Sequence, residues 1–401
     1  MPTSNLYILW LASWYPNRFD PYSGDFIQRH ARAASLFIPV TVFYVSQAGV
    51  EHSIENYSVE EKKTGNLTEV IIFFKFKRTG WKLADKIIYN LSYYRTYRKA
   101  IRQYFKKVGF PLAVHVHVPV KAGAIALWIK RKWTIPYFVT EHSTHYDTGT
   151  NHDFLKKGYL FRRRVQEIFR QALAVTNVSE KMGNIVRSIF DLPMPIIINN
   201  AVDEHLFSLS SGSNKSFRFI HVSTLIEEHK NIQGIIRCVK RLATKRNDFE
   251  LLIVGPATNL LKTQIVNEGL TIFVHFTGEI PYGDVAQEMK RACSLILFSW
   301  YENSPCVIGE ALCCGLPVIS TNVGGIGELI NNSNGSLIHA GDEAELVSSM
   351  EKMIDSYASF NRFKIAEQAK LKFSYPVIGD KFYNLYKNDI DTLQMLNETT
   401  H

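Results

Sequence analysis

The stretch from residue 293 to residue 329 constrains most strongly what this chain can fold into. Residues 294–300 form a continuous apolar run with the length and β-forming content of a strand buried on both faces of a parallel sheet. After a short polar loop, Ser304 and Pro305 predict the start of a helix, with the serine as its cap. Gly315 ends that helix, and residues 317–320 have the pattern of a second strand. The stretch therefore predicts a strand–helix–strand unit of a parallel sheet.

Two glutamates flank the start of this helix. Glu302 lies in the loop after the first strand, and Glu310 follows on the first turns of the helix. Ligands of parallel sheets bind beyond the carboxyl ends of the strands, where helix amides point outward. Such amides favour a phosphate, and carboxylates accept hydrogen bonds from sugar hydroxyls. The pattern therefore indicates a nucleotide-sugar site, although a bare pair of glutamates is also typical of a solvated helix surface.

Residues 302–319, ENSPCVIGEALCCGLPVI, resemble the donor-site signature of the retaining glycosyltransferases of family 4, the group 1 glycosyl transferases. A Gly-Gly-x-x-Glu pattern at 324–328 follows, as in that family. The resemblance implies an α/β protein of GT-B fold, with two Rossmann-like parallel-sheet domains facing across a cleft. The linker-like composition of residues 208–216 places the first domain at 1–207, completed by a C-terminal helix at about 375–401, and the donor domain at 208–374.

The resemblance also assigns roles to residues of the second domain. Glu302 would be catalytic, steadying positive charge at the anomeric carbon, and Glu310 would bind the ribose. Lys230 would neutralise the donor phosphates, whereas Thr224 stands where the family usually has an arginine. The residues predicted to bind the donor are Gly24, Thr224, Lys230, Gly278, Glu279, Asn303, Ser304, Cys306, Val307 and Glu310.

Histidines gather at two strand ends of the first domain. His115 and His117 project from one face of a strand, and His142 and His145 follow the next strand. A metal cluster is one interpretation, but thiolate or carboxylate ligands at metal-binding spacing are missing, so we expect no metal and no cofactor. The resemblance instead implies that His142 contacts the donor sugar as a second catalytic residue, and that Gly24 lets a loop approach the donor.

Five cysteines without a CxxC pair indicate neither a disulfide framework nor a structural zinc site. The amino-terminal apolar run is too short for a signal peptide, and no apolar run reaches the length of a membrane span. These features favour a cytoplasmic protein.

The net charge of +9 is concentrated in residues 75–107, where eleven lysines and arginines face a single acid, Asp85, and alternate with aromatic residues. Apolar residues recur there at spacings of three and four, which predicts an amphipathic helix. Such a helix can lie on an anionic membrane from the cytoplasmic side, or it can pack on a core with a solvated outer face. A basic stripe without a recognition module does not indicate a nucleic-acid partner.

Our main functional hypothesis is a retaining glycosyltransferase that moves a sugar from a nucleotide sugar to a glycan or lipid-linked acceptor during polysaccharide, lipopolysaccharide or other glycoconjugate synthesis. One alternative is a GT-B nucleotide-sugar epimerase, which would need no acceptor. Another alternative, from a different class, is a non-enzymatic protein that binds anionic lipid or nucleic acid through residues 75–107.

Overall fold

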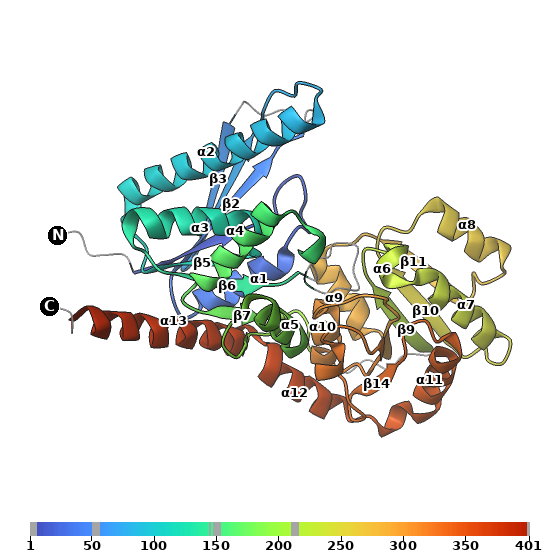
Figure 1. The fold of residues 1–401 in the computed structure, drawn as a ribbon. Coiled ribbons are helices and arrows are strands. Elements are labelled where there is room, and N and C mark those ends of the chain that lie inside the picture. The colour runs from blue at the N-terminus through green and yellow to red at the C-terminus, as the bar shows by residue number, and fades with distance from the viewer. Residues whose placement is uncertain (1–5, 50–56, 144–145, 147–153, 210–215, 399–401) are drawn as a thin grey trace. The chain divides into compact units, whose positions relative to one another are not determined.

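The computed structural model describes residues 6–49, 57–143, 146, 154–209 and 216–398, and it divides the chain into two compact units (Figure 1). Unit 1 comprises Met1–Val178, Gly183–Ile198 and Ile378–His401, and unit 2 comprises Ser179–Met182 and Asn199–Val377. Each unit is built on one largely or wholly parallel sheet covered by helices. Both units therefore have the α/β architecture that the alternation of strands and helices predicts.

Unit 1 contains an eight-stranded sheet in the order β3-β4-β2-β1-β5-β6-β7-β8. Only the edge strand β3 is antiparallel to its neighbour. The strands are β1 (Ile8–Ala12), β2 (Val40–Gln47), β3 (Tyr57–Thr64), β4 (Leu67–Phe74), β5 (Ala113–His117), β6 (Tyr137–Glu141), β7 (Val175–Asn177) and β8 (Ile196–Ile197). The helices are α1 (Asp25–Ser35), α2 (Lys82–Val108), α3 (Pro119–Trp133), α4 (Tyr159–Arg170), a 3-10 turn at Phe154–Lys156, and most of α5 (Glu180–Phe190) and α13 (Tyr375–Glu398).

Aromatic and histidine rings form the core between the sheet of unit 1 and two of its helices. Trp10 of β1 stacks on His117 of β5 with ring centroids 4.0 Å apart. Phe382 of α13 contacts both Trp10 and His30 of α1. The helices α1 and α13 therefore meet over the centre of the sheet, while α3 packs on β1, β5 and β6 with α2 and α4 beside it (Figure 1).

Unit 2 contains a six-stranded, wholly parallel sheet in the order β11-β10-β9-β12-β13-β14. The strands are β9 (Phe217–Val222), β10 (Phe249–Val254), β11 (Val274–Gly278), β12 (Ser294–Leu297), β13 (Val318–Thr321) and β14 (Gly335–Ile338). The helices are α6 (Glu227–Lys230), α7 (Ile232–Ala243), α8 (Asn259–Asn267), α9 (Tyr282–Lys290), α10 (Cys306–Cys313), α11 (Glu343–Ser356) and α12 (Arg362–Phe373), with 3-10 turns at Ile326–Glu328 and Tyr357–Ser359.

Two apolar clusters cover the two faces of the unit 2 sheet. Leu251 and Ile253 of β10 belong to a cluster with residues of α7, α8 and α11, whereas the alternate residues Leu252 and Val254 belong to a cluster with residues of α9, α10 and α12. Successive side chains of a strand point to opposite faces, which explains this division. Burial on both faces accounts for the continuous apolar runs of these strands.

The strand order defines one switch point in each sheet. In unit 2 the chain moves outward from β9 to β10 and β11 on one side, and from β12 to β13 and β14 on the other. In unit 1 the same reversal falls between β1 and β5. Ligands of open α/β sheets bind beyond the carboxyl ends of the strands at such points. The candidate sites are therefore expected after β9 and β12, and after β1 and β5.

Two sequence predictions need correction, and one strand was missed. Ser304 does not cap α10: Pro305 occupies the N-cap position without a side-chain cap, and the Ser304 carbonyl accepts a 2.7 Å hydrogen bond from Asn200. The antiparallel strand β3 was not predicted. The sequence placed residues 199–207 in the first domain, but they lie in unit 2. The backbone N–H of Val202 donates to the Phe373 carbonyl, and Val202 and Phe207 belong to the apolar cluster that includes residues of α10.

Residues 375–377 likewise belong to unit 2, so the C-terminal segment of unit 1 begins at Ile378. Most of the predicted linker, residues 210–215, lies outside the described residues. Within the described part of the chain, no helix combines the length and the apolar content that crossing a bilayer requires.

Candidate functional site

The carboxyl ends of β9 and β12 bring Lys230 and Glu302 into contact. Lys230 is the last residue of α6, which follows β9, and Glu302 lies in the loop after β12. Lys230 Nζ is 2.5 Å from Glu302 Oε1, and Ser299 Oγ donates a 2.8 Å hydrogen bond to the same oxygen. The side chains of Lys230 and Glu302 are 17% and 10% exposed. An ion pair largely shielded from solvent thus lies at the switch point of unit 2.

A glycine turn supports the backbone of the Glu302 loop. Gly325 N donates to the Asn303 carbonyl at 2.7 Å. Gly324 has a φ of +56°, and a Cβ at this position would lie 1.8 Å from the Glu302 carbonyl oxygen. No other residue fits there. The Asn303 side chain also accepts a 2.7 Å hydrogen bond from Ser179, so the loop is held from two sides.

Helix α10 carries the second glutamate of the signature. Glu310 is 5% exposed, and the Tyr282 hydroxyl donates a 3.0 Å hydrogen bond to its Oε1. The helix begins at Cys306 and Val307, both partly buried, and no side chain caps its N-terminus. Backbone amides at a helix N-terminus and the helix dipole favour an anion at this end.

The other predicted donor-binding residues of unit 2 lie at the same edge of the sheet or near it. Thr224 is exposed and follows β9, and Glu279 is exposed and follows β11. Gly278 is the last residue of β11, with a φ of +75°. Asn303 and Ser304 are both 8% exposed. Their roles in donor binding remain predictions.

Gly24 of unit 1 has a structural reason for being glycine. It is the N-cap of α1 with a φ of +62°, and a Cβ there would lie 2.6 Å from the Trp14 carbonyl group. The close approach of the Trp14 backbone therefore requires glycine whether or not a ligand binds nearby.

His142 directly follows β6 and is 8% exposed. Its Nε2 lies 3.1 Å from Nδ1 of His117. Burial, followed by the charges of His30 and His115, lowers the pKa of His142 well below its usual range. His142 is therefore a neutral imidazole at neutral pH, and one of its nitrogens can donate to a sugar hydroxyl.

A buried carboxyl group fixes the start of the His142 loop. Glu141 Oε1 accepts from the backbone N–H groups of His142 at 2.9 Å and Ser143 at 2.8 Å, and from the Ser143 hydroxyl at 2.8 Å. Burial raises the pKa of Glu141 above its usual value, although these hydrogen bonds oppose the shift.

Three residues of these sites were missed by sequence reasoning. Ser299 lies inside an apolar run, Tyr282 begins a helix without an evident motif, and His30 lies on α1, far along the chain from the other histidines. Ser299, a polar residue in a buried run three positions before Glu302, offered a usable signal. Tyr282 and His30 offered none, because their partners depend on the tertiary arrangement.

Family models match both halves of the chain. The model described as Glycosyltransferase Family 4 matches residues 31–206, and the model described as Glycosyl transferases group 1 matches residues 207–370. Among curated relatives, TuaC of Bacillus subtilis strain 168, named for teichuronic acid biosynthesis, is 23% identical over 347 residues, covering 82% of this chain and 85% of TuaC.

Solved structures with similar folds cover nearly the whole chain. Sucrose-phosphate synthase from Thermosynechococcus elongatus aligns with a TM-score of 0.74 at 15% identity, covering 96% of this chain and 98% of that one. HepE of Anabaena, solved in complex with UDP, aligns with a TM-score of 0.69 at 18% identity, covering 96% and 100%. With glycosyltransferase models matching both halves and a fold shared along its length, the chain is a GT-B glycosyltransferase of the group 1, family 4 kind.

Proposed function

We propose that this enzyme is a retaining hexosyltransferase that transfers a sugar from a nucleotide sugar to a glycan or lipid-linked acceptor. The observation that carries the proposal is the shielded Lys230–Glu302 ion pair at the switch point of unit 2. UDP in the similarly folded HepE structure supports a nucleotide-sugar donor. The name of the relative TuaC supports an acceptor in polysaccharide synthesis.

The two members of the ion pair have complementary roles in this proposal. As the bond between the anomeric carbon and the diphosphate oxygen breaks, its electron pair stays on the diphosphate and the sugar ring becomes positive. Lys230 neutralises the diphosphate, together with the amides at the start of α10, and Glu302 stabilises the ring. Donor binding exchanges the Lys230–Glu302 contact for a Lys230–phosphate contact.

The new bond forms on the face from which the diphosphate departs. The acceptor hydroxyl oxygen attacks the anomeric carbon, and its proton passes to the leaving diphosphate. This route needs no protein nucleophile and retains the anomeric configuration. Lysine and helix amides supply the positive charge, so we propose that transfer requires no metal on the diphosphate and no cofactor.

The remaining site residues bind and orient the donor. Glu310, held by Tyr282, accepts from the ribose hydroxyls. Gly278 and Glu279 lie on the side of the nucleobase, and Thr224 contributes a neutral hydroxyl where related enzymes carry an arginine. His142 donates to a hydroxyl of the transferred sugar.

We further propose that α2 holds the enzyme on the cytoplasmic face of an anionic membrane, where lipid-linked acceptors are found. Leu83, Ile87 and Leu91 lie four residues apart on this helix and are 73%, 53% and 60% exposed. Exposed Lys82, Lys86 and Arg95 accompany them. An exposed apolar stripe with neighbouring cations is the composition of an interfacial helix.

Part of the basic, aromatic segment has an internal role instead. Arg98 and Arg102 lie over the ring of Trp128, and Lys99 lies over Tyr57. Tyr93, Tyr97, Ile101 and Phe105 are buried in unit 1. The packing interpretation therefore holds for the second half of α2, and the membrane proposal concerns only the exposed side chains of its first half.

Product analysis with a panel of nucleotide sugars tests the proposed function. Each donor is incubated with the enzyme, with and without glycan and lipid-linked acceptors, and products are identified by mass spectrometry. We expect a glycosylated acceptor from one donor and a much slower release of nucleoside diphosphate without acceptor. A changed nucleotide sugar formed without any acceptor would instead identify an epimerase.

A further inference from the structure

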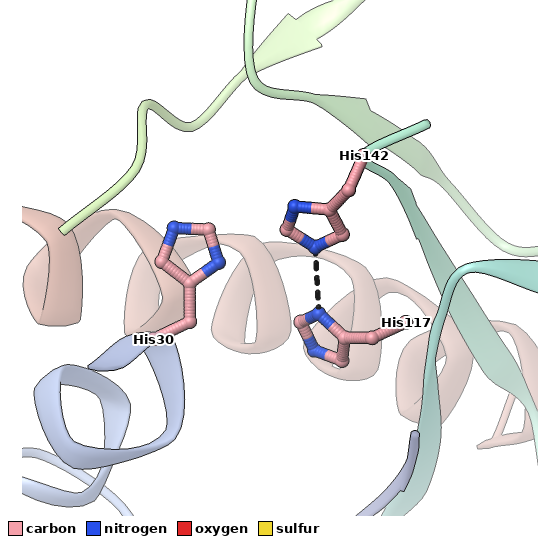
Figure 2. Close-up of side chains that lie close together, drawn as sticks. All are labelled: His30, His117 and His142. Atoms are coloured by element: carbon pink, nitrogen blue, oxygen red, sulfur yellow. Dashed lines mark hydrogen bonds between the residues drawn. The ribbon is translucent and has the colours of Figure 1, made fainter. Parts of the chain in front are cut away.

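Three buried histidines converge at the switch point of unit 1, outside the proposed diphosphate site. His30 comes from α1, His117 is the last residue of β5, and His142 follows β6 (Figure 2). One ring nitrogen from each lies within 4.8 Å of those of the other two. His30 and His117 are fully buried, and His142 is 8% exposed. Residues far apart in the sequence thus present three nitrogens to one small space.

The composition of the cluster differs from the one that the sequence suggested. Both nitrogens of His115 are engaged, Nδ1 with the Tyr386 hydroxyl at 2.6 Å and Nε2 with Thr140 Oγ1 at 2.7 Å. His145 lies outside the described residues. His30 takes their place and completes a three-histidine set with His117 and His142.

One N–N distance in the cluster is close to that of two ligands around one tetrahedral ion. Two imidazole nitrogens, each about 2.0–2.1 Å from a zinc ion, lie about 3.3 Å apart. His117 Nδ1 and His142 Nε2 are separated by 3.1 Å. In Figure 2 a nitrogen of His30 faces this pair, within the 4.8 Å span of the group. Metal binding would replace the hydrogen bond between His117 and His142 and would close the remaining N–N distances, which are at most 4.8 Å, to about 3.3 Å.

The surroundings favour neutral imidazoles in a dry site. The ring of Trp10 stacks on His117, Phe26 lies 4.8 Å from His142, and Phe382 lies 5.1 Å from His30, measured between ring centroids. Neutral imidazole is the form that binds metal ions, and an apolar wall limits access of water to such a site.

From this geometry we infer that His30, His117 and His142 form a binding site for one transition-metal ion of the zinc type. A set of three nitrogens and no carboxylate suits Zn²⁺, Co²⁺ or Ni²⁺ and disfavours Mg²⁺ and Ca²⁺, which select oxygen ligands. Three protein ligands leave a fourth position open on a tetrahedral ion.

Metal binding would also determine the tautomer of His142, a consequence that rests on the proposed function. With Nε2 bound to the ion, the ring proton must reside on Nδ1. The N–H would then be on Nδ1, which is buried in this structure, so the proposed contact with a sugar hydroxyl requires that Nδ1 become accessible when the donor binds. Metal content and transferase activity are measured separately, so failure of one inference does not imply failure of the other.

The test measures metal retention by the full chain without an affinity tag. The protein is stripped with a chelator, supplied with Zn²⁺ or Co²⁺, dialysed and analysed by elemental mass spectrometry. We expect one ion per chain, a visible Co²⁺ spectrum of tetrahedral type, and three imidazole ligands by X-ray absorption. Retention of less than one ion, or a coordination shell with fewer than three imidazoles, would overturn the inference.

Variants assign the site to these residues. His30→Gln should weaken Zn²⁺ binding by more than about 100-fold, since loss of even an outer partner of a ligand costs roughly 10- to 100-fold. The control is His115→Gln. His115 is a buried histidine of β5, the strand of His117, but it does not belong to the three-histidine set, so this variant should retain the ion. Equal Zn²⁺ affinity of the parent and His30→Gln proteins would contradict the assignment.

A measurement on the parent protein covers the case in which His30→Gln fails to fold. Ligands that bind only the folded state raise the melting temperature. Zn²⁺ should therefore raise the Tm of the stripped parent, whereas Mg²⁺ at the same concentration should not. Identical Tm values with Zn²⁺, Mg²⁺ and chelator would refute the site.

Discussion

The residue that determines the proposed chemistry is Glu302, and the structure changes how its substitution is expected to behave. From the sequence, Glu302 lies in a polar loop, and loss of its charge should cost little stability. In the structure its side chain is only 10% exposed and contacts both Lys230 and Ser299. Removal of the carboxylate leaves the shielded Lys230 ammonium without this partner. Catalytic and structural effects therefore have to be measured separately.

Glu302→Ala should lower kcat on the order of 100-fold or more, because the lost carboxylate stabilises charge that develops only in the transition state. The free energy of unfolding should fall by about 1–3 kcal/mol as Lys230 loses a charged partner. Steady-state kinetics and urea unfolding measure the two effects. Glu228→Ala, which removes an exposed glutamate from α6, is the matched control and should change neither. A folded Glu302→Ala enzyme with near-parent kcat would exclude the catalytic role.

Glu310→Gln should act on donor binding. An amide accepts less strongly than a carboxylate from the two ribose hydroxyls, so the donor KM should rise roughly 10-fold while kcat changes little. Tyr282→Phe, which removes the hydroxyl that holds Glu310, should raise the donor KM by a smaller factor. Calorimetric titration of nucleoside diphosphate measures the binding change directly. An unaltered affinity in Glu310→Gln would remove this residue from the site.

At the scale of single elements, the exposure of apolar residues changes along α2, and β9 buries a titratable histidine. The apolar positions of α2 share one periodicity, yet Leu83, Ile87 and Leu91 are exposed while Ile101 and Phe105 are buried. Periodicity locates an apolar face but does not reveal what covers it. On β9, His221 lies between apolar residues of a strand that is buried on both faces, and its ring is fully buried.

The membrane proposal predicts salt-sensitive binding of the enzyme to anionic vesicles through α2. Neutralising Lys82, Lys86 and Arg95 together should weaken binding by about 3 kcal/mol, or roughly 100-fold, because each cation near an anionic surface contributes about 1 kcal/mol. Replacing Leu83, Ile87 and Leu91 by serine should weaken it as well. Sedimentation with anionic and neutral liposomes measures both effects. Equal binding to the two kinds of vesicle, or none to either, would show that this face is only solvated.

His221 should make unit 2 sensitive to acid. Burial lowers its pKa to about 4, against the weaker opposing effect of the Ile296 carbonyl, which lies 2.9 Å from Nδ1. In the unfolded chain the histidine binds its proton near pH 6.5, whereas in the folded chain it does so only near pH 4. The free energy of unfolding is therefore unaffected by this group above pH 6.5, and it falls by up to about 3 kcal/mol as the pH is lowered toward 4. Urea unfolding from pH 7 to pH 4 measures the loss. His221→Gln should show a shallower pH dependence, and superimposable curves would contradict the prediction.

At the scale of the whole molecule, the alternation of strands and helices was sufficient to predict two parallel sheets, because buried strands and helix starts leave local signals. The order of the strands within a sheet leaves no such local signal in the sequence. Lys230 and Glu302 come into contact because β9 pairs with β12 as well as with β10, its neighbour in the sequence. The same limitation hid His30, whose partners lie on β5 and after β6. The domain boundary was misplaced because the linker-like composition begins at residue 208, whereas residues 199–207 before it already pack within unit 2.

The anomeric configuration of the first-formed product tests the central claim most directly, namely that Glu302 and Lys230 support transfer on the face that the diphosphate leaves. Proton NMR of the product from an α-linked nucleotide sugar, or of the first-formed free sugar where water replaces the acceptor, reveals this configuration. We predict an α-linked product whose formation is reduced on the order of 100-fold in Glu302→Ala. A β-linked product, or an α-linked product formed equally fast by Glu302→Ala, would contradict the claim.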